Sequence, residues 1–429
     1  MSANPEAVSA DSRQWFIAAI LSCAMTAFLW PGLLLGGGLV GGDIYTYFLP
    51  QKQLLAAEFA AGRVPLWHNR TALGYPLLAE SQAAVFYPTT QLLYRTLDVH
   101  TAFHANFLLH YVLAGLFAWR FFLSQRLSHL SSLFAALVYV CSWFPARASL
   151  EWTIVGGVWL PLTLWLADRL LQKPSVPRLA LLAAAHATHL LAGHFTLAFI
   201  NQLALAAFAF WKALPAGGFS SPASPLLGIA INRRLTATLL TVSGVALAFL
   251  LAAVQLRPTL ELRLTSQRSG DAASRFNPAY GHLPPFYLTQ LAASWWYWHS
   301  PEVIRAGELL RTPLASTADT NAVEAHFYVG LIPLSLCLTL LNRNVRRKLP
   351  MGAARFWLLL TFGSTIYATG WLVPICSKLP GFGFFMGPGR YTILGTLALA
   401  LLSGQMFDVL LRRRGWIFRW VMFCAVAVF

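Results

Sequence analysis

Long apolar segments alternate with short polar stretches along most of the chain, and this pattern predicts a helical membrane protein. Each segment is close to the roughly 20 residues that a helix needs to cross a bilayer. We expect about eleven transmembrane helices in an all-α polytopic fold, with residues 1–429 forming one transmembrane domain. The expected segments lie at about 16–39, 104–123, 130–145, 152–171, 178–193, 195–213, 235–256, 326–342, 355–373, 391–411 and 415–429.

Two long stretches interrupt this alternation, at about 42–103 and 257–325. A connection between two helices needs only a few residues. The first stretch is instead rich in aromatic residues, prolines and glycines, so we expect it to fold into an active-site element. Within it, Pro50 and Gly62 bound a short helix. The residues Phe48, Leu55 and Phe59 share one face of that helix, which would suit the membrane interface.

Composition and charge support the membrane class and orient the chain. Hydrophobic residues make up 57% of the sequence and charged residues 11%. The net charge of +16 does not indicate nucleic-acid binding, because the basic residues form short clusters between apolar segments. Such clusters mark cytoplasmic loops, so we place the N-terminus in the cytoplasm and both long loops outside. The cytoplasmic clusters contain Arg120, Arg126, Arg169, Lys173, Arg178, Lys212, Arg233, Arg234, Arg343, Arg346, Arg347, Lys348, Arg355 and Arg412 to Arg414.

The remaining composition narrows the chemistry. The five cysteines are scattered and have no metal-binding spacing, so neither a disulfide framework nor a cysteine metal site is expected. No small-residue cleavage site follows the first apolar segment, which we interpret as an uncleaved anchor.

Ionisable residues near the outer helix ends suggest a site on that side. They are Arg147, Glu151, His194 and Arg390. Ionisable groups at membrane depth are costly, and several on one side indicate function, although each alone fits an ordinary interfacial residue. Asp43 follows a glycine pair where the first helix leaves the bilayer, and a solvated helix-end role is the alternative. The aromatic run around Trp296 could stack on sugars, but we favour an interfacial belt.

The first outer loop also resembles a known family. The run GDIYTYFLP, followed by GRVPLWHNRTALGYPLLAESQAAVFYP, is similar to the opening of the YfhO family of bacterial membrane proteins, which resemble the GT-C glycosyltransferases. Further similar stretches follow in the family's order: LLAGHFTLAF around His194, QLRPTLELRLTSQRSG at 255–270, EAHFYVGLIPL from Glu324 and GPGRYTIL around Arg390. The resemblance therefore covers nearly the whole chain.

The sequence also departs from the family. His68-Asn69 stands where the family often has Asn-Pro, and Phe195-Thr196 where it usually has Pro-Gln. Family members are expected to be longer, and this chain stops at Phe429 within an apolar segment, so we expect it to be truncated at its C-terminus.

The resemblance implies sugar transfer from a polyprenyl-phosphate donor to an envelope glycopolymer, glycolipid or protein. This reaction would occur at the outer face of a bacterial cytoplasmic membrane. It needs a base for the acceptor hydroxyl and cations for the departing phosphate. Asp43 is then the expected base and Glu80 a supporting carboxylate; a divalent cation (Mg²⁺ or Mn²⁺) on these two is left open. The expected donor-phosphate ligands are Arg390, Arg268 and His194, and the expected acceptor or sugar contacts are Glu261, Glu324, Trp296 and Tyr87.

Two other classes remain open. A transporter or flippase of lipid-linked sugars would fit inverted repeats with broken helices, and no clear repeat is seen in the sequence. A noncatalytic envelope-assembly protein is the third interpretation. The sequence does not identify the sugar, the acceptor or the oligomeric state.

Overall fold

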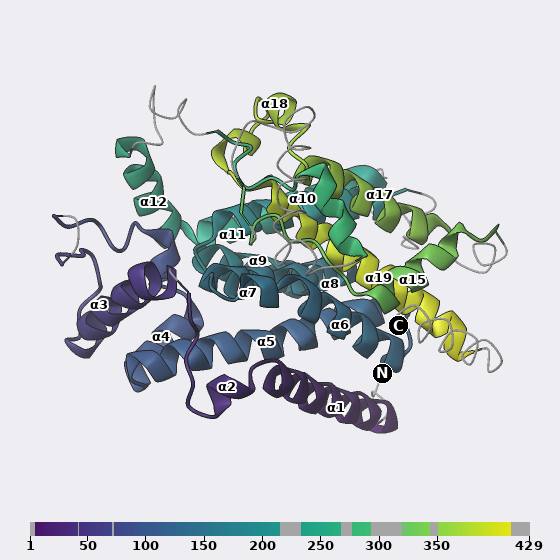
Figure 1. Cartoon of the computed structure of the whole chain (residues 1–429), viewed down its shortest axis with the longest axis horizontal. Coiled ribbons are helices and arrows are strands. Elements are labelled where there is room, and N and C mark those ends of the chain that lie inside the picture. Colours follow the sequence, from purple (N-terminus) through teal and green to yellow (C-terminus); the bar gives the residue numbers. More distant parts are fainter. Residues whose placement is uncertain are drawn as a thin grey trace. The chain divides into compact units, whose positions relative to one another are not determined.

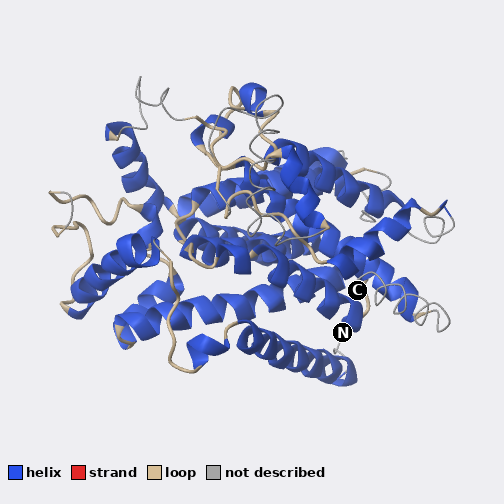
Figure 2. Cartoon of the chain, in the orientation of Figure 1, coloured by secondary structure: helices blue, strands red, loops and turns tan. Residues whose placement is uncertain are grey.

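The computed structural model describes residues 5–41, 43–70, 73–214, 233–266, 277–292, 320–321, 323–343 and 351–412 (Figure 1). Over these ranges the chain consists of helices and the loops that join them, without a β-strand (Figure 2). One isolated antiparallel bridge pairs His68 with Tyr75. The all-α prediction is confirmed for this part of the chain.

The described helices include six that are long and apolar enough to cross a membrane, or seven if one bent pair counts as a single span. The six are Ser12–Leu29, Val99–Ser124, His129–Arg147, Glu151–Gln172, Phe195–Lys212 and Pro388–Leu411. The bent pair is Leu235–Leu251 and Ala253–Thr265, whose axes differ by 77°. The chain is thus a helical, membrane-embedded protein. Of the other expected segments, 178–193 and 355–373 largely coincide with α9 (Val176–Leu191) and α17 (Met351–Ala368), and 415–429 lies outside the described residues.

The first helix, α1 (Pro5–Leu29), ends earlier than the sequence predicted. We expected it to reach Leu39, but it ends ten residues earlier. Pro31 causes this, because a proline disfavours the helical conformation of the residue before it, and Trp30 has non-helical angles (φ −127°, ψ 47°). After one short turn, α2 (Pro31–Leu34), Gly36 adopts φ +87° and directs the chain away from the helix axis.

Segments of the chain group into two compact units, and each is described by itself. The first unit comprises Met1–Phe117 and Ala148–Phe276. Its elements after α2 are η1 (Ile44–Phe48), α3 (Leu49–Ala60), η2 (Ser81–Ala83), α4 (Pro88–Thr96), the first part of α5 (Val99–Ser124), α7 (Glu151–Gly157), α8 (Trp159–Gln172), α9, α10 (Phe195–Lys212), α11 (Arg233–Leu251) and α12 (Ala253–Thr265). The helices α8 to α11 pack against one another.

The second unit comprises Ala118–Arg147 and Asn277–Phe429. Its core is α19 (Thr392–Leu411), which is buried along most of its length and packs against α6, α15 and α17. Gly404 permits the close approach of α6, because a methyl group there would lie 2.6 Å from Leu127 and 2.9 Å from Ala135. The other elements are α6 (His129–Trp143), η3 (Pro145–Arg147), η6 (Pro285–Leu291), α15 (Leu331–Leu338), η7 (Thr339–Leu341), α18 (Val373–Cys376), η8 (Phe382–Phe384) and η9 (Pro388–Tyr391).

The short helix predicted in the first outer loop is α3. It begins at Leu49, has Pro50 in its first turn, and ends at Ala60 before Gly62, which has φ +70°. Its apolar face was expected to suit the membrane interface, but it is buried inside the protein. Leu55 and Phe59 belong to a core cluster with Leu77 and Val85 of the same loop. The loop therefore has its own hydrophobic core.

Candidate functional site

A buried lysine lies at the centre of the first unit. Lys52 occupies the apolar face of α3 that also carries Phe48, Leu55 and Phe59, and its side chain is only 2% exposed. Burying an ammonium group is costly unless it is paired and hydrogen-bonded. Here the Lys52 Nζ lies 3.4 Å from a carboxylate oxygen of Glu151 and donates hydrogen bonds to two backbone carbonyls.

The carboxylate of Glu151 connects three helices. Glu151 is the first residue of α7, and its other carboxylate oxygen accepts a hydrogen bond from Asn106 Nδ2 on α5 at 3.2 Å. The Oδ1 of Asn106 in turn accepts the Thr89 hydroxyl at 2.7 Å. Each group of this buried network has a partner of opposite polarity, which is the condition for polar groups to be stable in a core.

The turn that carries Glu80 is held from several directions. Glu80 caps the short helix η2 by accepting from Gln82 N at 3.3 Å, and Ala84 closes the turn in the left-handed conformation (φ 54°). Gly193, with φ +87°, packs directly on this turn, since a methyl group there would lie 1.9 Å from the carbonyl oxygen of Ser81. The preceding carbonyls of Leu78 and Ala79 accept hydrogen bonds from α12: the Gln255 amide donates to the first and the Thr259 hydroxyl to the second. The two bonds measure 2.7 and 2.9 Å.

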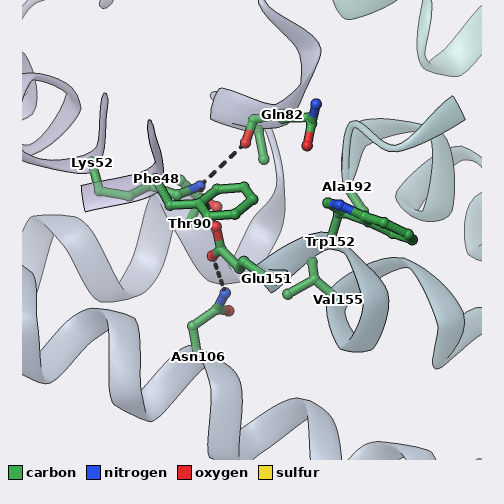
Figure 3. A pocket seen from close by; sticks show the side chains of 10 residues that line it. Phe48, Lys52, Gln82, Thr90, Asn106, Glu151, Trp152, Val155 and Ala192 are labelled. Carbon is green, nitrogen blue, oxygen red and sulfur yellow. Dashed lines mark hydrogen bonds and ion pairs between the residues drawn. The ribbon is translucent and has the colours of Figure 1, made fainter. Parts of the chain in front are cut away.

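A small cavity with both polar and apolar walls lies between this turn and α7 (Figure 3). Its volume is about 10 Å³, which suits about one water molecule. The hydroxyl of Thr90 on its wall is buried and has no hydrogen-bond partner among the described residues. A water molecule in this cavity would satisfy it. The lining residues are Phe48, Lys52, Gln82, Ala84, Thr90, Asn106, Glu151, Trp152, Val155 and Ala192.

His194 is close to the same cavity. Its ring stacks on Trp152, with centroids 3.8 Å apart and planes inclined by 7°. His194 also caps α10, because its Nδ1 accepts from Leu197 N at 3.4 Å. Because Gly193 packs on the carbonyl of Ser81, the structure brings His194 and the Glu80 turn, both predicted site elements, close together.

Asp43 lies at the start of the helix that leads into this region. Its side chain is exposed, and within the described residues its carboxylate makes no hydrogen bond or ion pair. The next five residues form one turn of π-helix, a rare form that often occurs at functional sites. Tyr47 of this turn lies near Glu80. Burial, and then the negative charge of Glu80, raise the pKa of the Tyr47 hydroxyl.

Tyr87, predicted to contact the acceptor or the sugar, is buried in the core of the first unit. Its oxygen lies 2.6 Å from His110 Nε2 and accepts a hydrogen bond from Trp159 Nε1 at 3.2 Å. His110 Nδ1 is 2.6 Å from the carbonyl of Asn106, which can only accept, so Nδ1 carries the proton. The Tyr87 hydroxyl therefore donates to His110. This arrangement gives Tyr87 a packing role in the structure.

A second polar cluster lies in the second unit and pairs two predicted residues. The Arg390 Nε lies 3.0 and 2.9 Å from the two carboxylate oxygens of Glu324, and its Nη2 also contacts one of them. Arg147 is fully buried beside this pair and donates to the backbone carbonyls of Trp143, Glu324 and His326. Arg390 was predicted to bind phosphate and Glu324 to contact the acceptor or sugar, whereas here each neutralises the other.

Glycines enclose the Arg390–Glu324 pair. A methyl group at Gly389 would lie 2.4 Å from the carbonyl oxygen of Glu324, and one at Gly387 would lie 2.5 Å from Arg390 Nε. Gly281, with φ +78°, packs on the Glu324 side chain in the same way. The glycines of the GPGRYTIL stretch thus bring the backbone close to the ion pair.

The other predicted residues lie elsewhere. Glu261 is exposed on α12 and forms a surface pair with Arg257 at 3.5 Å, with exposed fractions of 69% and 85%. Arg268 and Trp296 lie outside the described residues. In the described part of the chain, no three His, Cys, Asp or Glu side chains come close enough to hold a metal ion, and neither Asp43 nor Glu80 belongs to such a group.

Sequence reasoning did not select Lys52, Asn106 or Thr90. For Lys52 a signal exists, because a charged residue interrupts an apolar stripe at positions 48, 52, 55 and 59. A charge on a buried face is a local inconsistency, and such inconsistencies concentrate at functional sites. Asn106 and Thr90 carry no comparable signal.

No model of a protein family matches the chain, and a comparison with curated proteins finds no match. The chemistry must therefore be argued from the site. The first unit offers an exposed carboxylate at Asp43, a second carboxylate at Glu80, a buried cation and a stacked Trp–His pair. The second unit offers an arginine whose carboxylate partner is supplied by the chain itself.

Proposed function

We propose that the chain is a GT-C-type glycosyltransferase with about eleven spans. It moves a sugar from a polyprenyl-phosphate donor to an envelope glycopolymer, glycolipid or protein outside the bacterial cytoplasmic membrane. The main support is the meeting of stretches that resemble the YfhO family. In the first unit, Gly193 and Gln255 both contact the first-loop turn around Glu80. In the second, the stretches around Glu324 and Arg390 meet through an ion pair.

In this proposal Asp43 is the general base. An exposed carboxylate without a protein partner is open to an acceptor hydroxyl, and general-base catalysis requires such reach. Glu80 supports it from the neighbouring turn, close to Tyr47. Arg390 binds the donor phosphate by sharing or replacing its contact with Glu324, since guanidinium pairs with phosphate as with carboxylate.

The test of the proposal is Asp43→Asn. The change keeps the shape of the side chain but removes the base, which typically lowers the rate by a factor of ~100 to ~10,000. Sugar transfer from polyprenyl-phosphate donors is measured with purified wild type and variant at matched concentration. Glu58→Gln is the matched control, because Glu58 is a carboxylate of the same loop, on α3, that pairs with Arg63. Turnover of Asp43→Asn above about a tenth of wild type would show that Asp43 is not the base.

A flippase of lipid-linked sugars is the second candidate, and one observation favours it. The axes of α11 and α12 differ by 77°, and broken helices form binding sites in transporters. A deletion strain separates the two functions. If the strain lacks one envelope sugar and the lipid carrier of that sugar is accessible from outside, the transferase is supported. If that carrier accumulates on the inner leaflet, the flippase is supported.

A further inference from the structure

Lys52 stands out among the buried charges because of what its three contacts connect. Its ammonium donates to the carbonyl of Ala83 at 3.1 Å and of Gln82 at 3.4 Å, both in the turn after Glu80. Its third contact, Glu151, begins the helix that carries Trp152. One positive charge thus joins the Glu80 turn to α7. Figure 3 shows the contact of Lys52 with Gln82 as a dashed line.

The contacts of the turn suggest that it needs such an anchor. Glu80 is partly exposed, and its carboxylate accepts from Gln82 N over a long 3.3 Å, with the Tyr47 hydroxyl as a further neighbour. Ala84, although not a glycine, holds a left-handed conformation (φ 54°), which costs free energy. A strained backbone persists where the surrounding structure determines it. The carbonyls that Lys52 binds lie between the capping Glu80 and the strained Ala84.

The surroundings of Lys52 fix its position in turn. Glu151 is held by Asn106, and Asn106 by Thr89, so the carboxylate cannot follow the ammonium freely. Phe48 and Leu55, on either side of Lys52 on the same face of α3, are buried. Because Lys52 is held by these contacts, a shift of α7 would also move the turn that follows Glu80.

We propose that Lys52 is a positioning residue that sets the place of Glu80 relative to Trp152 and His194. This inference rests on the proposed transferase function, in which Glu80 supports the base. Lys52 itself does not touch the substrate. Loss of its charge should therefore lower the rate of the chemical step more than the affinity for the donor.

The experiment compares three variants. Lys52→Met with Glu151→Gln removes both charges together, so no unpaired buried charge remains. Lys52→Arg keeps the cation but replaces a compact ammonium by a wider planar group, so it tests position even if the double variant fails to fold. Arg63→Gln is the control, because Arg63 is an exposed cation of the same loop.

Two readouts are taken on the purified full chain. In hydrogen exchange, peptides covering residues 78–87 should exchange at least about tenfold faster in the double variant and detectably faster in Lys52→Arg. In sugar transfer, the kcat of the double variant should fall about 10- to 100-fold, the scale expected for a misplaced catalytic group. The donor KM should stay within about threefold. The Arg63→Gln control should match wild type in both measurements.

The outcomes separate the two proposals. Wild-type exchange in 78–87 and wild-type kcat in the folded variants would overturn the role of Lys52. Faster exchange with an unchanged kcat would also overturn it. Lys52 would then hold the Glu80 turn without any effect on catalysis. Absence of transfer by the wild type would instead reject the transferase function, while the exchange data would still decide whether Lys52 holds the turn.

Discussion

The two polar clusters bury their charges in different ways. In the first unit, Lys52 and Glu151 meet through one contact of 3.4 Å, beside a cavity that leaves the hydroxyl of Thr90 without a partner in the described structure. In the second unit, Arg390 contacts both carboxylate oxygens of Glu324, and the backbone of nearby glycines packs against the pair. The first arrangement leaves room for a small polar group. In the second, glycine backbone lies against both members of the pair.

This difference indicates that the two clusters have different roles. Bidentate pairs enclosed by backbone have a fixed geometry, so the Arg390–Glu324 pair should contribute mainly to the stability of the second unit until a phosphate displaces it. The first cluster should contribute more to the placement of the Glu80 turn than to global stability. The following changes test that contrast, beginning with the largest expected effect.

Glu324→Gln should destabilise the protein most. It removes the carboxylate charge that faces the largely buried guanidinium of Arg390 (17% exposed), and breaking a buried pair in this way costs about 3–5 kcal/mol. Unfolding of the purified protein in detergent gives the difference. Glu261→Gln, which removes the carboxylate of an exposed pair with Arg257, should cost about 0–1 kcal/mol. Equal effects of the two changes would contradict an enclosed, structural ion pair.

Gly193→Ala should have the next largest effect. The new methyl group would meet the carbonyl of Ser81 at 1.9 Å, and φ +87° is unfavourable for alanine. Gly62→Ala is the control, because Gly62 has φ +70° but open space around it, so only the conformational cost of about 1–2 kcal/mol applies. The clash should add about 1–2 kcal/mol at Gly193 and should displace the Glu80 turn. Equal unfolding free energies for both variants would show that the backbone around Gly193 and Ser81 can shift to accommodate the methyl group.

The smallest effect concerns pH and is predicted for the loop that carries His68. Burial, and then the charge of Arg70, lower the pKa of His68, whose Nδ1 accepts the Arg70 backbone N–H at 3.3 Å. A lowered pKa in the folded state means that the unfolded state binds the proton more tightly. The stabilisation is therefore present above the unfolded pKa of about 6.5 and is lost as the pH falls below it.

Hydrogen exchange of peptides covering 64–80 checks this at about pH 7.5 and 5.5, corrected for intrinsic rates. These peptides should lose protection at the lower pH, whereas His68→Gln should abolish the change. A pH response of His68→Gln equal to that of the wild type would show that His68 does not cause the loss of protection.

The sequence predicted local features of the fold better than the partners of its charges. The membrane class follows from long apolar segments, and α3 follows from Pro50 and Gly62, because these signals act within a few residues. Pro31 gave a local signal that the apolar pattern outweighed, so the end of α1 was placed ten residues too late. Glu324 and Arg390 were both selected, but their pairing depends on a fold that brings together positions 66 residues apart. Lys52 was missed because a charged residue on a helix is usually assigned to solvent.

The division of the second unit into two chain segments also affects the order in which it can form during synthesis. The side chain of Trp143 in α6 donates to Thr392, 249 residues later, and Ser131 donates to Asp408, 277 residues later. At a translation rate of about 5–20 residues per second, α6 exists for roughly 12–50 s before α19 emerges. During that interval Trp143 and Ser131 lack their partners on α19. A transient neighbour, such as the insertion machinery or another helix, would shield these polar groups from lipid until α19 is made.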